Sequence, residues 1–331
     1  MTAKARTSNK SKAPKRAAAQ STTGAVNATS PLTPLTAEQT KWVESSLRAM
    51  SLEEKVGQLL FTTYHGSFTP TDSDAFASMT HDINDLHVGG FITITHGSPL
   101  GIVKDQAYPT AVLANMLQSK SKLPLLIGAD FERGTAQRQD EGTSFPTAMA
   151  LAAAGNPPDA YTMGKITALE ARAVGVHWVY APVCDVNNNP GNPIINTRSF
   201  GEDPQRVSEF VAQFVRGVQE NGALATAKHF PGHGDTATDS HIDLPIIKAD
   251  RDRMERLELV PFRAAISAGV GSIMTGHLNV PAFEPDPAGI LRRHRSGRVA
   301  VDDRVRGLRA GGGVDCGELF VTLCISMSFN P

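Results

Sequence analysis

Acidic, basic and imidazole side chains are concentrated in one segment of the chain, KHFPGHGDTATDSHIDLP at residues 228–245. Two glycines and two prolines among these eighteen residues favour an irregular loop over a helix or a strand. Groups of these types can move protons near neutral pH, bind metal ions or contact polar ligands. The segment therefore predicts a functional site, with seven candidate residues: Lys228, His229, His233, Asp235, Asp239, His241 and Asp243.

Two of the chemistries open to this loop have specific weaknesses. A metal site lacks the usual HExxH or paired HxH spacing. A dinucleotide site is suggested by GHGDTA at 232–237, but Pro245 follows before any helical spacing begins, and the phosphate-binding motif requires a helix there. The ligands of the metal site would be His229, His233, Asp235 and His241.

Acid–base chemistry by Asp239 and His241 is the favoured interpretation. In an extended Asp-Ser-His, side chains two residues apart point to the same side of the backbone. A carboxylate beside an imidazole fixes its tautomer and raises its basicity, which equips the histidine to give and accept a proton near neutral pH. This chemistry needs no metal ion and no organic cofactor, and we expect none.

Further polar residues follow runs of apolar residues elsewhere in the chain. Asp130 follows LPLLIGA, Asp185 follows WVYAPVC and His277 follows SIMTG. The apolar runs predict buried strands, and the helical stretches between them are typical of parallel βα units. We expect strands at 59–64, 90–95, 123–130, 178–186, 223–228 and 272–278, and helices at 108–119, 158–174, 204–221 and 251–268.

Six such units favour an α/β fold of the (β/α)8 TIM-barrel type over an open doubly wound sheet. Because the complete barrel has eight units, we expect this one to be incomplete. A helical pattern also precedes the first strand, with Thr36 as its expected N-cap. Its apolar residues recur on the faces expected from helical spacing: Trp42, Leu47, Leu52, Val56 and Leu60.

Charge divides the chain into three parts. Residues 1–37 hold six Lys or Arg and no acid, residues 38–290 hold 29 acids against 19 bases, and residues 291–331 hold seven Arg against four acids. We expect a disordered basic arm, one barrel domain and an aberrant Arg- and Gly-rich tail over these three ranges. The acidic central domain disfavours nucleic-acid binding.

Composition places the protein in a reducing, aqueous compartment. The three cysteines imply no disulfide framework. The N-terminus lacks the apolar stretch of a signal peptide, and no run is long enough to predict a membrane span. We therefore expect a cytoplasmic monomer that does not associate with membranes.

Four segments resemble motifs of the glycoside hydrolase family 3 β-N-acetylhexosaminidases. KHFPGHGDT followed by DSH resembles the family's acid/base loop, in which an Asp-His dyad replaces the usual carboxylic acid. DFERGTAQR at 130–138, followed by GTSFP at 142–146, is similar to its sugar-binding turn. DVNNNPGNPIINTRSFGEDP at 185–204 is similar to its next loop, and IMTGHLNVPAFEPDP at 273–287 to its sixth-strand segment. The resemblance extends over roughly residues 38–287.

The resemblance implies a role for each of five residues around the −1 subsite. Asp130 would hydrogen-bond sugar hydroxyls. Arg138 and Arg198 would clamp the sugar ring, and Lys228 and His229 would complete the floor. A carboxylate and several cationic donors that converge on one place also suit a polyhydroxylated ligand by their own chemistry.

Structural roles remain open for two of these residues. Asp130 could cap the following turn, and Arg198 could pair with Glu202 or Asp203. The sequence also departs from the family motif at Arg133, where the family has glycine. This side chain adds bulk to a turn that would lie close to the sugar.

The resemblance further implies retaining hydrolysis of terminal β-linked N-acetylglucosamine, with His241 protonating the leaving oxygen and an Asp nucleophile forming a glycosyl-enzyme. The strand that carries the nucleophile in the family, of the type GLVVTDA, is absent from this sequence. Asp315 matches only the spacing, because Gly311–Gly313 before it make a poor strand. We attribute the tail to a shifted reading frame and expect one added strand from 318–327.

Two other functions therefore stay open beside hydrolysis. The chain could be an inactive carbohydrate-binding remnant that lacks the nucleophile. It could also be a metal-dependent hydrolase that uses the histidine loop. For the first two functions the expected partners are saccharides that contain N-acetylglucosamine, from cell-wall or chitin fragments.

Overall fold

The computed structural model describes residues 35–98, 101–237, 245–283 and 320–322. Its main sheet is parallel throughout, with the strand order β1-β2-β5-β6-β7-β8-β9. The strands are β1 (Phe61–Tyr64), β2 (Gly90–Thr93), β5 (Leu126–Ala129), β6 (Trp178–Val179), β7 (Leu224–Phe230), β8 (Ser272–Thr275) and β9 (Phe320–Thr322). A separate antiparallel hairpin consists of β3 (His96–Ser98) and β4 (Gly101–Val103).

The six predicted strands and the predicted parallel arrangement are confirmed, since each predicted range overlaps one strand of the sheet, although β7 extends two residues beyond its predicted end at 228. β9 lies within the run 318–327, where one added strand was expected, and it pairs with β8. β1 and β9 occupy the two ends of the strand order. The described residues thus form an incomplete parallel α/β barrel.

The sheet curves around a cluster of inward-facing side chains. Trp178 of β6 packs edge to face against Phe61 of β1, with ring centroids 5.4 Å apart, although two strands separate them in the sheet. Trp178 Nε1 also donates to Thr226 Oγ1 on β7 and to Ser272 Oγ on β8, at 2.8 Å each. Contacts between strands that are not neighbours require a curved sheet, as in a barrel.

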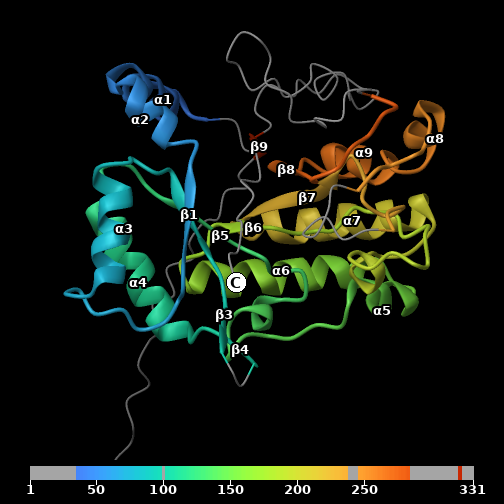
Figure 1. Ribbon diagram of the computed structural model, residues 1–331, viewed down its shortest axis with the longest axis horizontal. Coiled ribbons are helices and arrows are strands. Elements are labelled where there is room, and N and C mark those ends of the chain that lie inside the picture. The colour runs from blue at the N-terminus through green and yellow to red at the C-terminus, as the bar shows by residue number, and fades with distance from the viewer. Residues whose placement is uncertain (1–34, 99–100, 238–244, 284–319, 323–331) are drawn as a thin grey trace, which may run out of the picture.

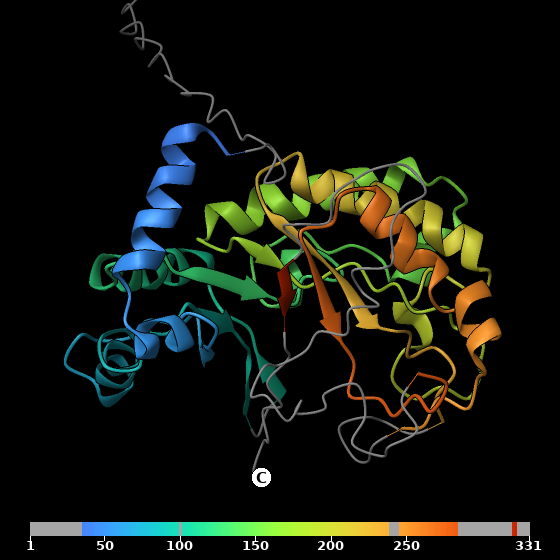
Figure 2. The ribbon, with the colours of Figure 1, turned by 90° about the horizontal axis from the view of Figure 1, so that it is seen from above.

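Helices lie around the outside of the sheet, with α3 and α4 on one side and α8 and α9 on the other (Figures 1 and 2). They are α1 (Ala37–Ala49), α2 (Leu52–Gly57), α3 (Asp74–Asn84), α4 (Ala107–Lys120), α5 (Ala148–Ala153), α6 (Pro158–Ala173), α7 (Pro204–Gln219), α8 (Arg251–Arg256) and α9 (Val260–Ser267). Two short 3₁₀ turns bear on the site: η1 (Thr135–Gln137) ends just before Arg138, and η2 (Asn196–Arg198) contains Arg198.

The predicted helices at 108–119, 158–174 and 204–221 are confirmed as α4, α6 and α7. The prediction of one helix over 251–268 was wrong, because this range contains both α8 and α9. Pro261 has no N–H to donate and fits only the first turn of a helix, so a new helix begins just before it.

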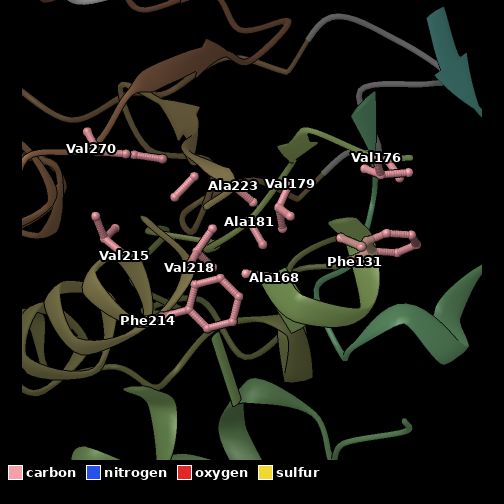
Figure 3. Packing of buried hydrophobic residues seen from close by; sticks show 14 of the residues in the cluster. Phe131, Ala168, Val176, Val179, Ala181, Phe214, Val215, Val218, Ala223 and Val270 are labelled. Atoms are coloured by element: carbon pink, nitrogen blue, oxygen red, sulfur yellow. The ribbon is translucent and has the colours of Figure 1, made fainter. Parts of the chain in front are cut away.

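The outer core lies between the sheet and helices α6 and α7 (Figure 3). A Cβ on Gly164 would lie 2.6 Å from the Phe214 carbonyl oxygen, and one on Gly217 would lie 2.2 Å from the Tyr161 carbonyl oxygen. The two glycines therefore allow the helix backbones to approach closely. Apolar residues of α7 recur every three or four positions and are buried: Val207, Phe210, Val211, Phe214, Val215 and Val218.

The first helix begins as predicted. Thr36 Oγ1 accepts a hydrogen bond from the Gln39 backbone N–H at 3.2 Å, and Gln39 Oε1 accepts one from the Thr36 N–H at 2.9 Å. Its apolar residues are exposed, however: Trp42 is 52% exposed and Leu52 of α2 is 72% exposed. No helix in the described ranges is both long and apolar enough to cross a bilayer. The predicted arm and tail lie almost wholly outside these ranges.

Candidate active site

Asp130 and Lys228 form an ion pair that links the carboxyl-terminal parts of strands β5 and β7. Asp130 directly follows β5, and its Oδ1 accepts from Lys228 Nζ of β7 at 2.9 Å. Its Oδ2 accepts from Arg138 Nη2, also at 2.9 Å, and Arg138 Nη1 donates to Thr95 Oγ1 at 3.1 Å. The side chain of Lys228 is only 2% exposed, whereas Asp130 is 30% exposed. Asp130 thus lies at the accessible side of this ion pair.

Glu132 is a member of the site that the sequence analysis did not identify. Its Oε1 lies 2.7 Å from Lys228 Nζ and 2.7 Å from Arg198 Nη2, and its Oε2 accepts from Arg198 Nε at 2.9 Å. Arg198 therefore pairs with Glu132 and not with Glu202 or Asp203, the two partners that the sequence left open. In Asp-Phe-Glu the two carboxylates are two residues apart, a spacing that puts them on one side of an extended backbone.

Asp185 holds the imidazole of His229. Asp185 Oδ2 lies 2.7 Å from His229 Nδ1, and Oδ1 accepts from the backbone N–H of His233 at 2.6 Å. The other ring nitrogen, His229 Nε2, lies 3.3 Å from Arg198 Nη2. Because a guanidinium can only donate, we assign the proton to Nδ1 and the lone pair to Nε2.

Burial and charge fix the protonation states of these groups. Burial alone would raise the pKa of Asp130 and of Glu132, but Lys228 and the neighbouring arginines lower both. Burial would likewise lower the pKa of Lys228, but Asp130 and Glu132 raise it overall. Desolvation lowers the pKa of His229 despite its contact with Asp185, so the imidazole is neutral at pH 7.

Three cations and three carboxylates therefore alternate through the cluster: Arg138, Asp130, Lys228, Glu132, Arg198 and, through His229, Asp185. Burial would raise the pKa of Asp185, but the imidazoles of His229 and His233 and the His233 N–H lower it. Charged donors, a partly exposed carboxylate and a neutral imidazole acceptor are the groups that bind sugar hydroxyls.

Two further side chains hold the loops that carry the site. Asn192 is buried; its Nδ2 donates to the carbonyls of His233 and Gly234 at 2.8 and 2.9 Å, and its Oδ1 accepts from the Ile195 N–H at 2.8 Å. It thereby ties residues 185–204 to the start of the histidine loop. Glu170 of α6 accepts from the Thr143 N–H at 2.9 Å and supports the turn that follows β5.

The five residues expected to bind the sugar come together in this cluster, whereas Asp239, His241 and Asp315 lie outside the described residues. Within the described ranges, no three His, Cys, Asp or Glu side chains converge as metal ligands. Asp235, a candidate ligand in the alternative metal-site interpretation, pairs with Arg253 of α8 at 2.6 Å.

Comparison with known proteins identifies the family. The family model described as the glycosyl hydrolase family 3 N-terminal domain matches residues 51–293. The chain belongs to glycosyl hydrolase family 3. This confirms the expected family and, with the parallel sheet, the expected TIM-type barrel.

Several relatives of this family 3 chain carry hexosaminidase names. It is 36% identical over 242 residues to the beta-N-acetylglucosaminidase/beta-glucosidase of Cellulomonas fimi, which covers 73% of this chain and 40% of the relative. A family 3 beta-N-acetylglucosaminidase from Paenibacillus sp. FPU-7 superposes with a TM-score of 0.64 at 40% identity, covering 72% of this chain and 44% of that structure.

A third relative has been solved with a sugar ligand. NagZ from Neisseria gonorrhoeae, in complex with N-trifluoroacetyl-D-glucosamine, superposes with a TM-score of 0.58 at 25% identity, covering 69% of this chain and 66% of that structure. The family 3 chain described here spans less than half the length of the Cellulomonas relative.

Proposed function

We propose that this chain carries the sugar-binding side of a retaining β-N-acetylglucosaminidase site, specific for terminal β-linked N-acetylglucosamine. The observation that carries the proposal is the convergence of Asp130, Arg138, Arg198, Lys228 and His229 in one charge-balanced cluster at the carboxyl ends of parallel strands. Catalytic residues occupy this end of TIM-type barrels. The names of the relatives supply the substrate class.

The cluster can bind a sugar ring through fixed polar groups. Asp130 and Arg198 are each about a third exposed, at 30% and 31%. They therefore remain accessible to a ligand while their inner atoms are held by ion pairs. Sugar hydroxyls both donate and accept hydrogen bonds, so an alternating set of acceptors and donors suits them better than a surface of one charge sign.

Proton transfer is assigned to His241, oriented by Asp239. In this proposal the protonated imidazole donates its proton to the leaving glycosidic oxygen while an aspartate attacks the anomeric carbon. Water, deprotonated by the same histidine, then hydrolyses the glycosyl-enzyme. The stem of this loop is held by the bond from the His233 N–H to Asp185 and by Asn192.

A second candidate function is saccharide binding without hydrolysis. The three carboxylates of the cluster, Asp130, Glu132 and Asp185, each already pair with a cation or an imidazole. These pairings share the negative charge of each carboxylate with a neighbouring group, which makes all three poor nucleophiles, although Asp130 keeps accessible lone pairs for hydrogen bonds. The described cluster supports binding, and a nucleophile must come from elsewhere in the chain.

Two measurements on the full chain test the proposal. Titration calorimetry with N-acetylglucosamine should detect binding, and Asp130→Asn should weaken it by about tenfold or more, because a bond to a charged group is lost. Asp140→Asn, an exposed residue of the same turn, is the matched control and should bind like the wild type. Equal affinities in all three proteins would contradict the assigned site.

Covalent trapping separates hydrolysis from binding alone. A slow 2-deoxy-2-fluoro or similar glycoside should add one glycosyl mass to a protein that has a working nucleophile. Binding without trapping supports the second candidate. For the metal-dependent alternative we expect no stoichiometric zinc by mass spectrometry, and one tightly bound ion per chain would favour that alternative.

A further inference from the structure

Glu132 lies behind the groups that would meet the sugar. Its side chain is 11% exposed, against 31% for Arg198 and 30% for Asp130. It nevertheless contacts cations from two different elements, Lys228 of β7 at 2.7 Å and Arg198 of η2 at 2.7 and 2.9 Å. Glu132 is therefore the group that connects these two elements inside the cluster.

The bonds of Arg198 leave very little freedom to its guanidinium. Of its five N–H groups, two donate to Glu132, one Nη2–H points to His229 Nε2 at 3.3 Å, and one Nη1–H donates to the Ile194 carbonyl at 3.0 Å. This leaves one Nη1–H without a partner among the described residues. Its direction is set by the other four bonds.

We propose that Glu132 is a positioning residue that fixes Arg198 and Lys228 relative to each other, so that the remaining Nη1–H of Arg198 and the outer face of Asp130 meet the sugar at a set distance. This role rests on the proposed function. Glu132 acts through its two cations and does not itself contact the ligand.

A glutamine at position 132 cannot hold Lys228 and Arg198 in the same way. Its amide offers one oxygen, and its NH2 group would face either Lys228 or Arg198 with donors opposed to donors. The bidentate bond to Arg198 is lost, and the guanidinium can rotate. We expect Glu132→Gln to weaken N-acetylglucosamine binding by about tenfold to a hundredfold.

The pH dependence of the binding affinity gives a second, independent readout. Lys228 is faced by Asp130, Glu132, Arg198 and the neutral His229; the two carboxylates raise its pKa, while burial and Arg198 lower it. In Glu132→Gln only Asp130 still raises the pKa, so Lys228 loses its proton at a lower pH. The affinity of the variant should therefore fall more steeply than that of the wild type as the pH is raised above about 7.

The experiment uses the full chain as wild type, Glu132→Gln, Glu132→Asp and Glu202→Gln. Glu202 is exposed, lies four residues after Arg198, and provides the same chemical change outside the cluster. Calorimetry with N-acetylglucosamine at pH 7 and pH 9, together with thermal unfolding of each protein, gives affinity, pH dependence and folded state. The Nε–Hε signal of Arg198 in 15N NMR, assigned by its loss in Arg198→Lys, reports the bidentate bond directly.

We expect Glu132→Gln to lose affinity, gain pH dependence and lose the slowly exchanging Arg198 signal, while Glu202→Gln matches the wild type. Glu132→Asp keeps the charge but is one methylene shorter, so it should bind weakly with a level pH profile; it carries the test if Glu132→Gln does not fold. If the wild type binds, and Glu132→Gln binds with the wild-type affinity at both pH values, the role of Glu132 alone is overturned. A wild-type protein that does not bind would overturn the proposed function, and this role with it.

Discussion

Two histidines, His177 and His229, lie where desolvation keeps the imidazole neutral. Burial and the neighbouring Arg172 lower the pKa of His177 to about 4, and its Nδ1 accepts from the Ile127 N–H at 3.3 Å. Desolvation also lowers the pKa of His229. An imidazole that protonates at a lower pH in the folded than in the unfolded chain makes the free energy of unfolding depend on pH.

The sign of this dependence follows from the direction of the shifts. Both histidines have a lower pKa in the folded than in the unfolded chain, so their contribution is complete above about pH 6.5 and is lost as the pH falls below it. The carboxylates of the cluster also have lowered pKa values, and their contribution is lost only below about pH 4. Urea unfolding should show a two-stage loss of stability on acidification.

His177→Gln provides the test of the first stage. Glutamine can still accept from the Ile127 N–H but cannot take up a proton, so the decline between about pH 6.5 and pH 4 should become shallower. Thr40→Gln, which changes no titratable group at an exposed position of α1, is the control and should leave the decline unchanged. Parallel curves for His177→Gln and the wild type would contradict the assignment.

Helices α6 and α7 pack backbone to backbone at Gly164 and Gly217. Gly217 lies where any Cβ would approach the Tyr161 carbonyl oxygen to 2.2 Å, and both partners are helix backbone. Replacement of a helical glycine by alanine ordinarily stabilises a helix by about 0.5–1 kcal/mol. Here the helices must move apart, so the sign should reverse.

We expect Gly217→Ala to lower the free energy of unfolding by about 1–3 kcal/mol, measured by urea denaturation. Arg216→Ala, on the exposed side of the same helix, should change it by no more than about 0.5 kcal/mol. A stabilised Gly217→Ala variant would mean that the two helices do not pack as closely as described.

The strands and long helices could be predicted because their apolar patterns are local. α7 shows its buried stripe in sixteen consecutive residues, and β5 reads as an uninterrupted apolar run. α3 was missed although Ser73 caps it and Phe76, Met79 and Ile83 are buried at helical spacing. α5 has only six residues, mostly alanine, and therefore no period to detect.

The site was predicted less completely because its contacts are distant in sequence. The motifs indicated Asp130, Arg138, Arg198, Lys228 and His229, and the structure brings all five together. Glu132 was missed since its partner Arg198 is 66 residues away, and no local pattern connects a glutamate of one loop with an arginine of another. Asp185 was noted as a strand-end acid, but its partner His229 lies 44 residues away.

For the whole molecule, the decisive features are the two ends of the sheet and the exposed apolar side chains of α1 and α2. In the part of the chain that the structure describes, β1 and β9 stand at opposite ends of the strand order, and an unpaired strand edge is a site for association with other chains. Trp42, Leu47 and Val56 are each more than half exposed, at 52%, 54% and 51%. Large apolar surfaces of this kind promote association.

We therefore expect the 331-residue chain to be poorly soluble, so that the binding and unfolding measurements need dilute protein, and to show no hydrolysis of a chromogenic N-acetyl-β-glucosaminide above an empty-vector control. Sedimentation of concentrated protein measures the first property, and release of the chromophore measures the second. A highly soluble protein with clear turnover would contradict the expectation. Asp315 would then become the first residue to test as the nucleophile.

The two tryptophans of the chain occupy opposite environments, and this makes the protein its own fluorescent probe. Trp178 is 4% exposed and bonded to two strands inside the barrel, whereas Trp42 is 52% exposed on α1. Iodide should quench the red-edge emission of Trp42 and leave the blue-edge emission of Trp178. A Trp42→Phe variant would report only the barrel interior, and a Trp178→Phe variant only the N-terminal helix. A molecule that binds over α1 should shift the emission of the Trp178→Phe variant to the blue and leave the emission of the Trp42→Phe variant unchanged.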